Sequence, residues 1–431
     1  MRSPCPTLLE AFLLVALLIA VNTDARRAKG EPKVKGYYPT YNSEAQPPSK
    51  IDWAAYTDVL YFMVIPQADG SLSFDPALTP SQGEKLVTEF VSQARKPLTS
   101  NHLRRREPSS QYGWLDRLTV HVVAHPDAKL TQTSHLCRHF SNLTATAPSR
   151  KRFAQVLVNF AKKHGFTGLE MDWEYPNGDG IGCNSRNPDD VVNFGLLTKE
   201  LRTLWPEVEL TAAVGITGLN GADGSPATPK ETALLTANLD YINLMAYDVF
   251  GSWSETTGPI APLYALVPRP VALKQGFKAS QVLLGIPGYA KRSELASPKL
   301  VPKVVGSHTT LYYQKPTGVT PPGGKFDDKP GKDICGNAQK WGGSFLVTEL
   351  ISNGWLSKDQ KTGLKGYKRY FDECSGQPFL SNGKYLISYD DKDSTIAKAK
   401  FAKKNNMGGI YFFDTMGPPA DTLQEARKIF S

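Results

Sequence analysis

The stretch FTGLEMDWEYP, residues 166–176, places three carboxylates in a short apolar run that ends at a proline. Residues two apart in a β-strand share a face, so Glu170, Asp172 and Glu174 are expected to line one face and the apolar residues between them the other. Charged side chains are rare inside an apolar strand unless they have partners or a task. This pattern fits the wall of a barrel, with the acidic face inside and the apolar face under the outer helices.

Seven further β-branched or aromatic runs surround this stretch, and amphipathic helical stretches lie between several of them. The eight predicted strands are residues 34–41, 58–66, 118–126, 166–174, 209–216, 240–248, 281–290 and 408–414. Alternation of strand and helix predicts an α/β fold, a closed (β/α)8 TIM barrel. An open, doubly wound sheet is the alternative, but no GxGxxG turn marks a nucleotide site.

The segment between the last two strands has a different texture, rich in Gly, Pro, Tyr and Lys. It is longer than an ordinary connection between a strand and a helix. We therefore predict a small α+β insertion over residues 291–380, at the carboxyl-terminal rim of a barrel formed by residues 26–290 and 381–431. Barrel active sites lie at that rim.

The amino terminus reads as a signal peptide over residues 1–25, because the apolar run 11–21 is too short to span a bilayer. An uncleaved anchor or a buried helix is the alternative. No other stretch predicts a membrane span, so we expect a secreted, extracellular protein.

The cysteine pattern agrees with secretion. Four cysteines follow the predicted signal peptide, and an even number in a secreted chain indicates two disulfides with three possible connectivities. We expect Cys335 to pair with Cys374 inside the insertion and Cys137 with Cys183 across the rim. None stands in a metal-binding pattern, so no metal or other cofactor is expected. The sequon at Asn142 would be glycosylated only if exposed.

The formal net charge of +9 could favour anionic surfaces. The densest basic cluster, residues 95–107, comes with no nucleic-acid-binding motif, so a solvated loop is the better interpretation and no nucleic-acid partner is expected.

The three carboxylates suggest acid catalysis. Acidic residues stacked towards an active-site mouth repel one another, which can hold one of them protonated near neutral pH. Glu174 comes last, at the rim, where a protonated carboxyl could act as a general acid. The alternative is an ion-paired strand with Lys or Arg opposite, which explains three acids in register poorly.

The segment resembles the DGxDxDxE signature of glycoside hydrolase family 18, the chitinases and chitinase-like lectins, which often closes DWEYP. The sixth strand and its loop, LMAYDVFGSWSETTGPIAPL, are also similar to that family, as is LLGIPGYA. The insertion ending YFDECSGQPFL resembles that of secreted fungal members. The resemblance covers nearly the whole chain after the signal peptide.

The resemblance implies substrate-assisted hydrolysis, in which the acetamido oxygen of the sugar attacks the anomeric carbon. Glu174 would protonate the leaving oxygen, and Asp172 would hold the acetamide N–H and stabilise the oxazolinium ion. Met245, Tyr247 and Asp248 would line the same subsite, with the Tyr247 hydroxyl on the acetamide oxygen. The aromatic side chains expected to stack on sugars are Tyr37, Tyr175, Trp253 and Phe413. The implied ligand is chitin or its oligomers, bound by a monomer.

The sequence departs from the family pattern in the same region. Thr167 replaces the first Asp of the motif, which we interpret as the loss of a buried charge. Glu170, the inner acid of the catalytic set, replaces the second Asp and adds a methylene that can misplace Asp172. Phe413 replaces a Trp at the end of the last strand. The third strand lacks the usual SxGG; His125 could stand in as an acid or base, but a plain loop residue is the better interpretation.

Residues 95–136 fit the family worse than the segments on either side, which suggests an unremoved intron or a wrong splice site. Peptides covering RREPSSQYGWLDR in the natural protein would contradict this hypothesis.

Two functions therefore compete. One is a chitin-binding protein on a chitinase frame, with hydrolysis weakened or lost; the other is an active retaining chitinase with Glu174 as the acid. The sequence slightly favours the first.

Overall fold

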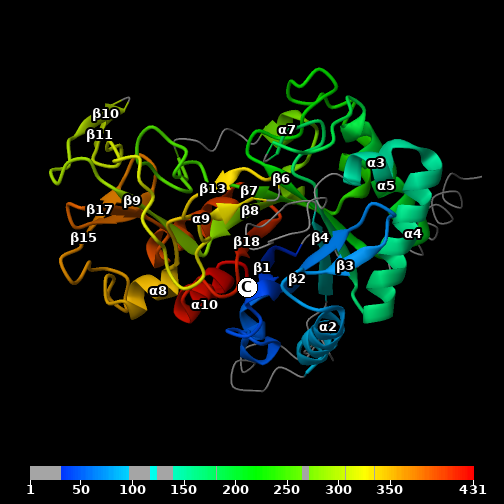
Figure 1. The fold of residues 1–431 in the computed structure, drawn as a ribbon, viewed down its shortest axis with the longest axis horizontal. Coiled ribbons are helices and arrows are strands. Elements are labelled where there is room, and N and C mark those ends of the chain that lie inside the picture. Colours follow the sequence, from blue (N-terminus) through cyan, green and yellow to red (C-terminus); the bar gives the residue numbers. More distant parts are fainter. Residues whose placement is uncertain are drawn as a thin grey trace, which may run out of the picture.

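The structure is a computed structural model. It describes residues 31–96, 117–123, 139–180, 182–264, 271–305, 307–333 and 335–431. Its centre is a closed barrel of eight parallel strands in the order β1-β18-β8-β7-β6-β5-β4-β2, with β1 pairing back to β2 (Figure 1). The strands are β1 (Lys33–Pro39), β2 (Asp58–Pro66), β4 (Arg117–Val123), β5 (Gly168–Asp172), β6 (Glu209–Gly215), β7 (Tyr241–Met245), β8 (Val282–Pro287) and β18 (Gly409–Phe413). The predicted TIM barrel is confirmed, and all eight predicted strands contribute to it.

Helices cover the outside of the barrel (Figure 1). They are α2 (Pro80–Ala94), α3 (His139–Ala145), α4 (Ala147–His164), α5 (Asp190–Leu204), α6 (Ala233–Asn238), α7 (Val271–Lys274), α9 (Lys392–Lys404) and α10 (Ala420–Lys428). Short 3-10 turns are η1 (Thr40–Asn42), η2 (Pro48–Lys50), η3 (Trp53–Ala55) and η4 (Ala279–Gln281), and β3 (Leu72–Phe74) forms a hairpin with β2. Gly165 ends α4 in the left-handed conformation, as the sequence predicts.

Side chains alternate across the barrel wall as the opening stretch requires. Met171 and Trp173 belong to the large core between strands and helices, where Trp173 packs on Phe140 of α3 at a centroid distance of 5.4 Å. A separate cluster that includes Tyr37 and Tyr411 fills the barrel interior. The two faces of β5 therefore serve two different cores.

The segment between β8 and β18 builds a five-stranded antiparallel sheet in the order β14-β9-β17-β16-β15, drawn in green-yellow to orange beside the barrel (Figure 1). Its strands are β9 (Tyr289–Glu294), β14 (Ser344–Leu346), β15 (Lys368–Asp372), β16 (Gln377–Ser381) and β17 (Tyr385–Ser388), with helix α8 (Val347–Ser352) after β14. Two hairpins, β10 (Lys303–Val305) with β11 (His308–Thr310) and β12 (Gly331–Lys332) with β13 (Ala338–Gln339), extend from it. We call this region the insertion.

The expected disulfide pairing is wrong. Cys335 bonds to Cys183, with 5.6 Å between their Cα atoms, and Cys374 is a half-buried free thiol. The reason is the β12–β13 hairpin, whose turn carries Cys335 out of the insertion to the loop after β5. Cys137, the partner that we expected for Cys183, lies outside the described residues, as do the predicted signal peptide, His125 and most of residues 95–136. Within the described ranges, no helix is long and apolar enough to cross a membrane.

Candidate active site

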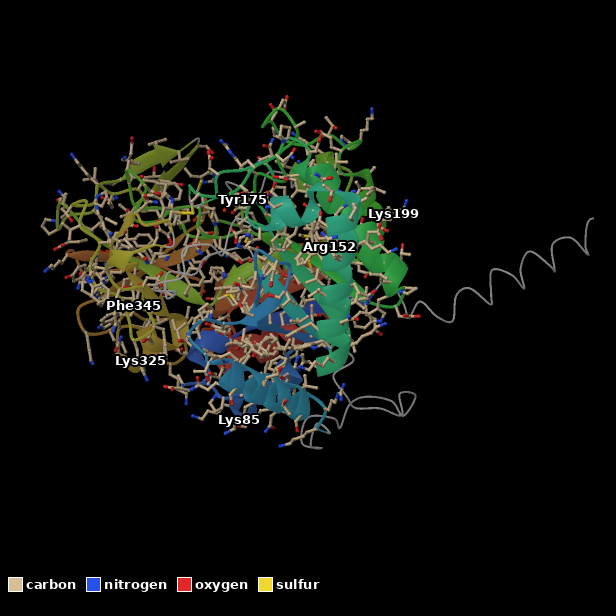
Figure 2. The ribbon with its side chains drawn as sticks, turned by 45° about the vertical axis from the view of Figure 1, so that its right-hand side comes forward. Lys85, Arg152, Tyr175, Lys199, Lys325 and Phe345 are labelled. Carbon is tan, nitrogen blue, oxygen red and sulfur yellow. A yellow bond between two sulfur atoms is a disulfide. The ribbon has the colours of Figure 1, made fainter. Side chains whose placement is uncertain are left out.

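The three carboxylates of the opening stretch follow the inner face of β5 up to the rim. Glu170 is fully buried and Asp172 is 5% exposed, whereas Glu174, beyond the end of the strand, is half-buried. Figure 2 labels Tyr175, the next residue, at this end of the barrel. The acids therefore run from the closed interior to the solvent-facing mouth, in the order that the strand period predicts.

Glu170 is held by donors from three other barrel strands. Its carboxylate accepts hydrogen bonds from the Tyr37 hydroxyl of β1, from Thr211 Oγ1 of β6 at 2.7 Å and from Asn243 Nδ2 of β7 at 2.7 Å. Asn243 Nδ2 also lies 2.8 Å from the Tyr37 hydroxyl. Burial, together with the Glu170 charge, raises the pKa of Tyr37 well above its ordinary value, so Tyr37 remains a proton donor. The longer side chain is thus held by hydrogen bonds from three other strands of the barrel.

A buried ion pair lies on the inner face of β1, two residues before Tyr37. Lys35 Nζ is 2.6 Å from Glu209 Oε1, and both side chains are fully buried. Lys33 lies 3.3 Å from Asp58 and 3.6 Å from Glu209. Burial alone lowers the pKa of Lys35, but the nearby carboxylates, led by Glu209, outweigh it and raise the pKa well above its ordinary value. Lys35 is therefore a permanent cation inside the barrel.

Aromatic rings close the interior beneath the mouth. Phe413, at the end of β18, is half-buried, and its ring centroid lies 5.5 Å from Tyr37, 5.4 Å from Phe62 and 6.2 Å from Tyr247. The Tyr411 hydroxyl donates to the Tyr247 hydroxyl at 3.1 Å. Burial raises the pKa of Tyr247 well above its ordinary value, so its hydroxyl also stays protonated. The mouth therefore has an apolar floor with a protonated phenol at its edge.

The rim brings the remaining acids together. Burial raises the pKa of Tyr175 well above its ordinary value. The charge of Glu174 and a hydrogen bond with Glu174 raise this pKa further, and Asp172 and Asp248 add smaller effects. Asp248, at φ +54°, lies close to Tyr289, whose pKa is raised by burial first and by Asp248 next. The loop after β5 folds back onto the backbone of Glu174, where Asn184 Nδ2 donates to the Glu174 carbonyl at 2.5 Å.

Two predicted sugar-binding residues lie at the edge of this group. Met245 ends β7 and is half-buried. Trp253 lies on the loop after β7 and is 63% exposed, with its ring so close to Gly251 that a Cβ there would approach it to 2.3 Å. Trp253 therefore presents its ring to solvent.

Our interpretation of Thr167 is wrong. Thr167 is exposed, immediately before β5 begins, at the end of the strand opposite the mouth. An Asp there would face solvent, so Thr167 removes no buried charge from the carboxylate layer. Of the two motif changes, only Glu170 lies among the buried site residues.

The sequence reasoning missed several residues of the site: Lys35, Thr211, Asn243, Tyr289 and Tyr411. A signal was available for Lys35 and Asn243, because each is a polar residue two positions before a candidate site residue of the same strand, Tyr37 or Met245. Thr211 is identified only by the strand register that pairs it with Glu170. Tyr289 lies just past β8 and carries no such signal.

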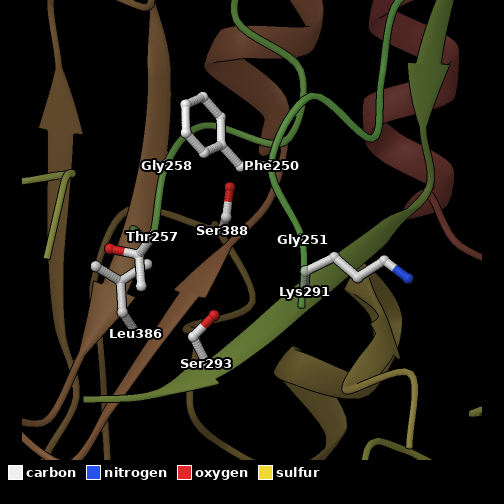
Figure 3. A pocket seen from close by; sticks show the side chains of 8 residues that line it. All are labelled: Phe250, Gly251, Thr257, Gly258, Lys291, Ser293, Leu386 and Ser388. Atoms are coloured by element: carbon white, nitrogen blue, oxygen red, sulfur yellow. The ribbon is translucent and has the colours of Figure 1, made fainter. Parts of the chain in front are cut away.

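A small pocket lies between the loop after β7 and strands β9 and β17 of the insertion (Figure 3). Two of its hydroxyl groups are used within the protein: Thr257 Oγ1 donates to the Tyr312 carbonyl at 2.5 Å, and Ser388 Oγ lies 2.7 Å from the Tyr312 hydroxyl. This pocket joins the insertion to the barrel. The described residues contain no cluster of His, Cys, Asp and Glu that could hold a metal ion.

A TIM barrel with carboxylates leading up one strand to its mouth defines a barrel of the glycoside hydrolase type. The chain belongs to glycosyl hydrolases family 18, whose model matches residues 34–417.

Its relatives include a chitinase-like effector of Moniliophthora roreri, 30% identical over 97% of both chains, and one of Moniliophthora perniciosa, 29% identical over 91% of this chain and 85% of the relative. Chitinase A1 of Niallia circulans is 31% identical over 67% of this chain and 40% of that protein. Among solved structures, a chitinase of Rhizomucor miehei covers 93% of this chain and all of its own, with a TM-score of 0.72 and 24% identity. That likeness supports the fold.

Proposed function

We propose that the protein binds chitin-derived oligomers of β-1,4-linked N-acetylglucosamine and hydrolyses them weakly or not at all. The observation that carries the proposal is the setting of Glu170. Its carboxylate is held across the barrel by Tyr37, Thr211 and Asn243, and a hydrogen bond to a charged group is worth about 1.5–3 kcal/mol. These bonds fix a side chain one methylene longer than the Asp of the family signature, two residues before Asp172 on the same face of β5, and a misplaced Asp172 would slow turnover.

The binding half of the proposal rests on the mouth itself. Phe413 offers a ring above a floor of Tyr37 and Phe62, and Tyr247 offers a protonated hydroxyl beside it. A solved plant class V chitinase with this fold was crystallised with (GlcNAc)3. The name chitinase-like effector, given to two relatives, is consistent with a role in which hydrolysis is secondary.

The second candidate is an active retaining chitinase. It is supported by the presence of Glu174, Asp172, Tyr247 and Asp248, the residues to which the family resemblance gives catalytic roles. Glu174, Asp172 and Asp248 all raise the pKa of Tyr175, and the Tyr247 ring centroid lies 6.2 Å from that of Phe413. In that case Glu174 protonates the leaving oxygen while the acetamide of the sugar acts as the nucleophile.

One experiment separates the two. The protein is incubated with chitin hexamer, and both fragment release and hexamer affinity are measured, with Glu174→Gln as the matched control that keeps the shape and removes the acid. We expect hexamer binding by both proteins and little fragment release by either. Fragment release at ordinary chitinase rates, abolished in Glu174→Gln, would establish the second candidate. An absence of hexamer binding would contradict both.

A further inference from the structure

We propose that the Cys183–Cys335 disulfide, together with the β12–β13 hairpin that carries Cys335, forms a strap across the mouth of the barrel that selects free chitooligosaccharides over chains held in solid chitin. The proposal rests on the proposed function and names which form of the ligand the site admits. We call this element, the disulfide and residues 331–339 without residue 334, the disulfide strap.

The position of the strap follows from the topology. It joins the loop after β5 to the insertion, which begins after β8, and these two strands are three places apart in the eight-stranded ring. The loops of β6 and β7, including Tyr247 and Asp248, lie between its two ends along the ring. The disulfide therefore links the loop after β5 to the insertion rather than to a neighbouring loop of the barrel.

The end of the disulfide strap at Cys183 is held against the backbone of Glu174. Asn184, next to Cys183, donates to the Glu174 carbonyl at 2.5 Å, and Gly180 lies so close to that carbonyl that a Cβ would approach it to 2.5 Å. The start of the same loop is fixed to the β6 loop, since Asn177 Nδ2 donates to the Gly221 carbonyl at 2.7 Å. Movement of Cys183 away from the mouth would therefore break contacts with the catalytic segment.

The insertion end is equally anchored. The turn is closed by Asp333, whose backbone N–H donates to the Asn337 carbonyl at 2.9 Å and whose carboxylate accepts from Asn337 N at 2.7 Å. At the base of the hairpin, Asp327 accepts from the backbone N–H groups of Gly323 and Ser344 at 2.7 and 2.9 Å. Ser344 starts β14, which pairs with β9, and β9 begins at Tyr289 in the site. The disulfide strap thus holds the loop after β5, near Glu174, at a fixed separation from β9, which begins at Tyr289.

A fixed bridge between the loop after β5 and the insertion changes which ligands can enter the candidate site. A sugar chain lying on a crystal surface would have to enter from the side, whereas a free oligomer can enter end first beneath the bridge. Because the steric barrier acts against the solid form alone, it discriminates between two forms of one ligand without changing the contacts in the site.

The test compares three proteins made through a secretory host: the parent, Cys183→Ser/Cys335→Ser, and the control Cys374→Ser, which removes a thiol that lies outside the disulfide. Hexamer affinity is measured by calorimetry and binding to insoluble chitin by depletion. We expect the double variant to gain about tenfold in binding to insoluble chitin, the ratio that 1.4 kcal/mol represents, with hexamer affinity nearly unchanged. The control should behave as the parent does.

Equal binding of insoluble chitin by parent and double variant, with hexamer binding retained, would overturn the strap and leave the proposed function intact. A parent that binds neither ligand would overturn both. Should the double variant fail to fold, the folded parent is reduced with a phosphine, which takes up the oxygen of water as the disulfide becomes two thiols, and the thiols are capped before the same measurements. A non-reducing peptide map without a Cys183–Cys335 peptide would also contradict the proposal.

Discussion

At the scale of single residues, Glu170 is the change in the family signature that lies inside the candidate site. Both Thr167 and Glu170 depart from the family signature, yet Thr167 is exposed before β5 and Glu170 is buried among three donors. The chemistry of a motif thus depends on which of its positions face the barrel interior.

We predict that Glu170→Asp raises chitin-hexamer hydrolysis, by up to about 100-fold, because a shorter carboxylate restores the spacing to Asp172 and a 1 Å misplacement can cost that much. Fragment release per mole of enzyme is the measurement. Thr167→Asp is the matched control and should change nothing, since its side chain faces solvent. A gain of activity in the control without a gain in Glu170→Asp would show that Glu170 does not limit hydrolysis.

We predict that Phe413→Ala weakens hexamer binding about tenfold, because it removes the ring that packs on Tyr37, Phe62 and Tyr247. Calorimetry with a chitin hexamer measures the loss. Phe371→Ala, at an exposed aromatic on the insertion, serves as the control and should retain the affinity of the parent. Unchanged binding by Phe413→Ala would remove this ring from the proposed site.

At the scale of elements, helix α4 contains a titratable group that faces an apolar neighbourhood. His164 is 6% exposed, its ring lies 4.5 Å from Phe160 and 6.1 Å from Phe74, and its Nε2 is buried without a hydrogen-bond partner. Burial lowers the pKa of His164 from 6.5, with Glu84, 3.8 Å away, opposing part of the effect and Lys163 adding to it.

The sign of the pH dependence follows from that shift. Well above pH 6.5, His164 is neutral in both the folded and the unfolded protein, so it contributes no pH dependence there. As the pH falls below that value, the unfolded protein takes up the proton first, and stability is lost. We predict that the melting temperature of the parent falls more steeply between pH 7.5 and 5.5, roughly the histidine titration range, than that of His164→Phe. Parallel slopes for the two proteins would show that His164 does not contribute.

Most of the elements could be predicted because their signals are local. The eight barrel strands are runs of β-branched and aromatic residues, and the helix before β5 shows its period and its terminal Gly165. Helix α3 could not be predicted in this way, since it has seven residues and depends on packing of Phe140 against Trp173 and Phe153. The shared inner face of Glu170, Asp172 and Glu174 could be predicted from the strand period alone. The place of Tyr289 in the site could not, because it depends on the tertiary fold.

At the scale of the whole molecule, the barrel interior holds charges as well as rings. Because Lys35 and Glu209 are both fully buried and 2.6 Å apart, removing Lys35 takes a close cation from a buried carboxylate, which keeps Lys33 at 3.6 Å. We predict that Lys35→Met lowers the free energy of unfolding by about 3–5 kcal/mol and that Lys35→Met/Glu209→Met recovers most of this loss. Urea unfolding provides the measurement. A double variant as unstable as the single one would show that the pair acts through Lys33 and Asp58 instead.

The disulfide shows the limit of sequence reasoning at this scale. Nearness in sequence favours Cys335 with Cys374, but the β12–β13 hairpin brings Cys335 to Cys183, 152 residues away in the chain. Nothing local in either cysteine's neighbourhood encodes that meeting, because it depends on how the insertion is seated on the barrel.

The same bond has a consequence for survival in a protease-rich setting. A cut at any one peptide bond between Cys183 and Cys335 leaves two fragments that remain covalently one particle, since the disulfide closes that length of chain into a ring. Such nicked protein would migrate as a single species until a thiol is added, so its loss of integrity would be visible only on a reducing gel.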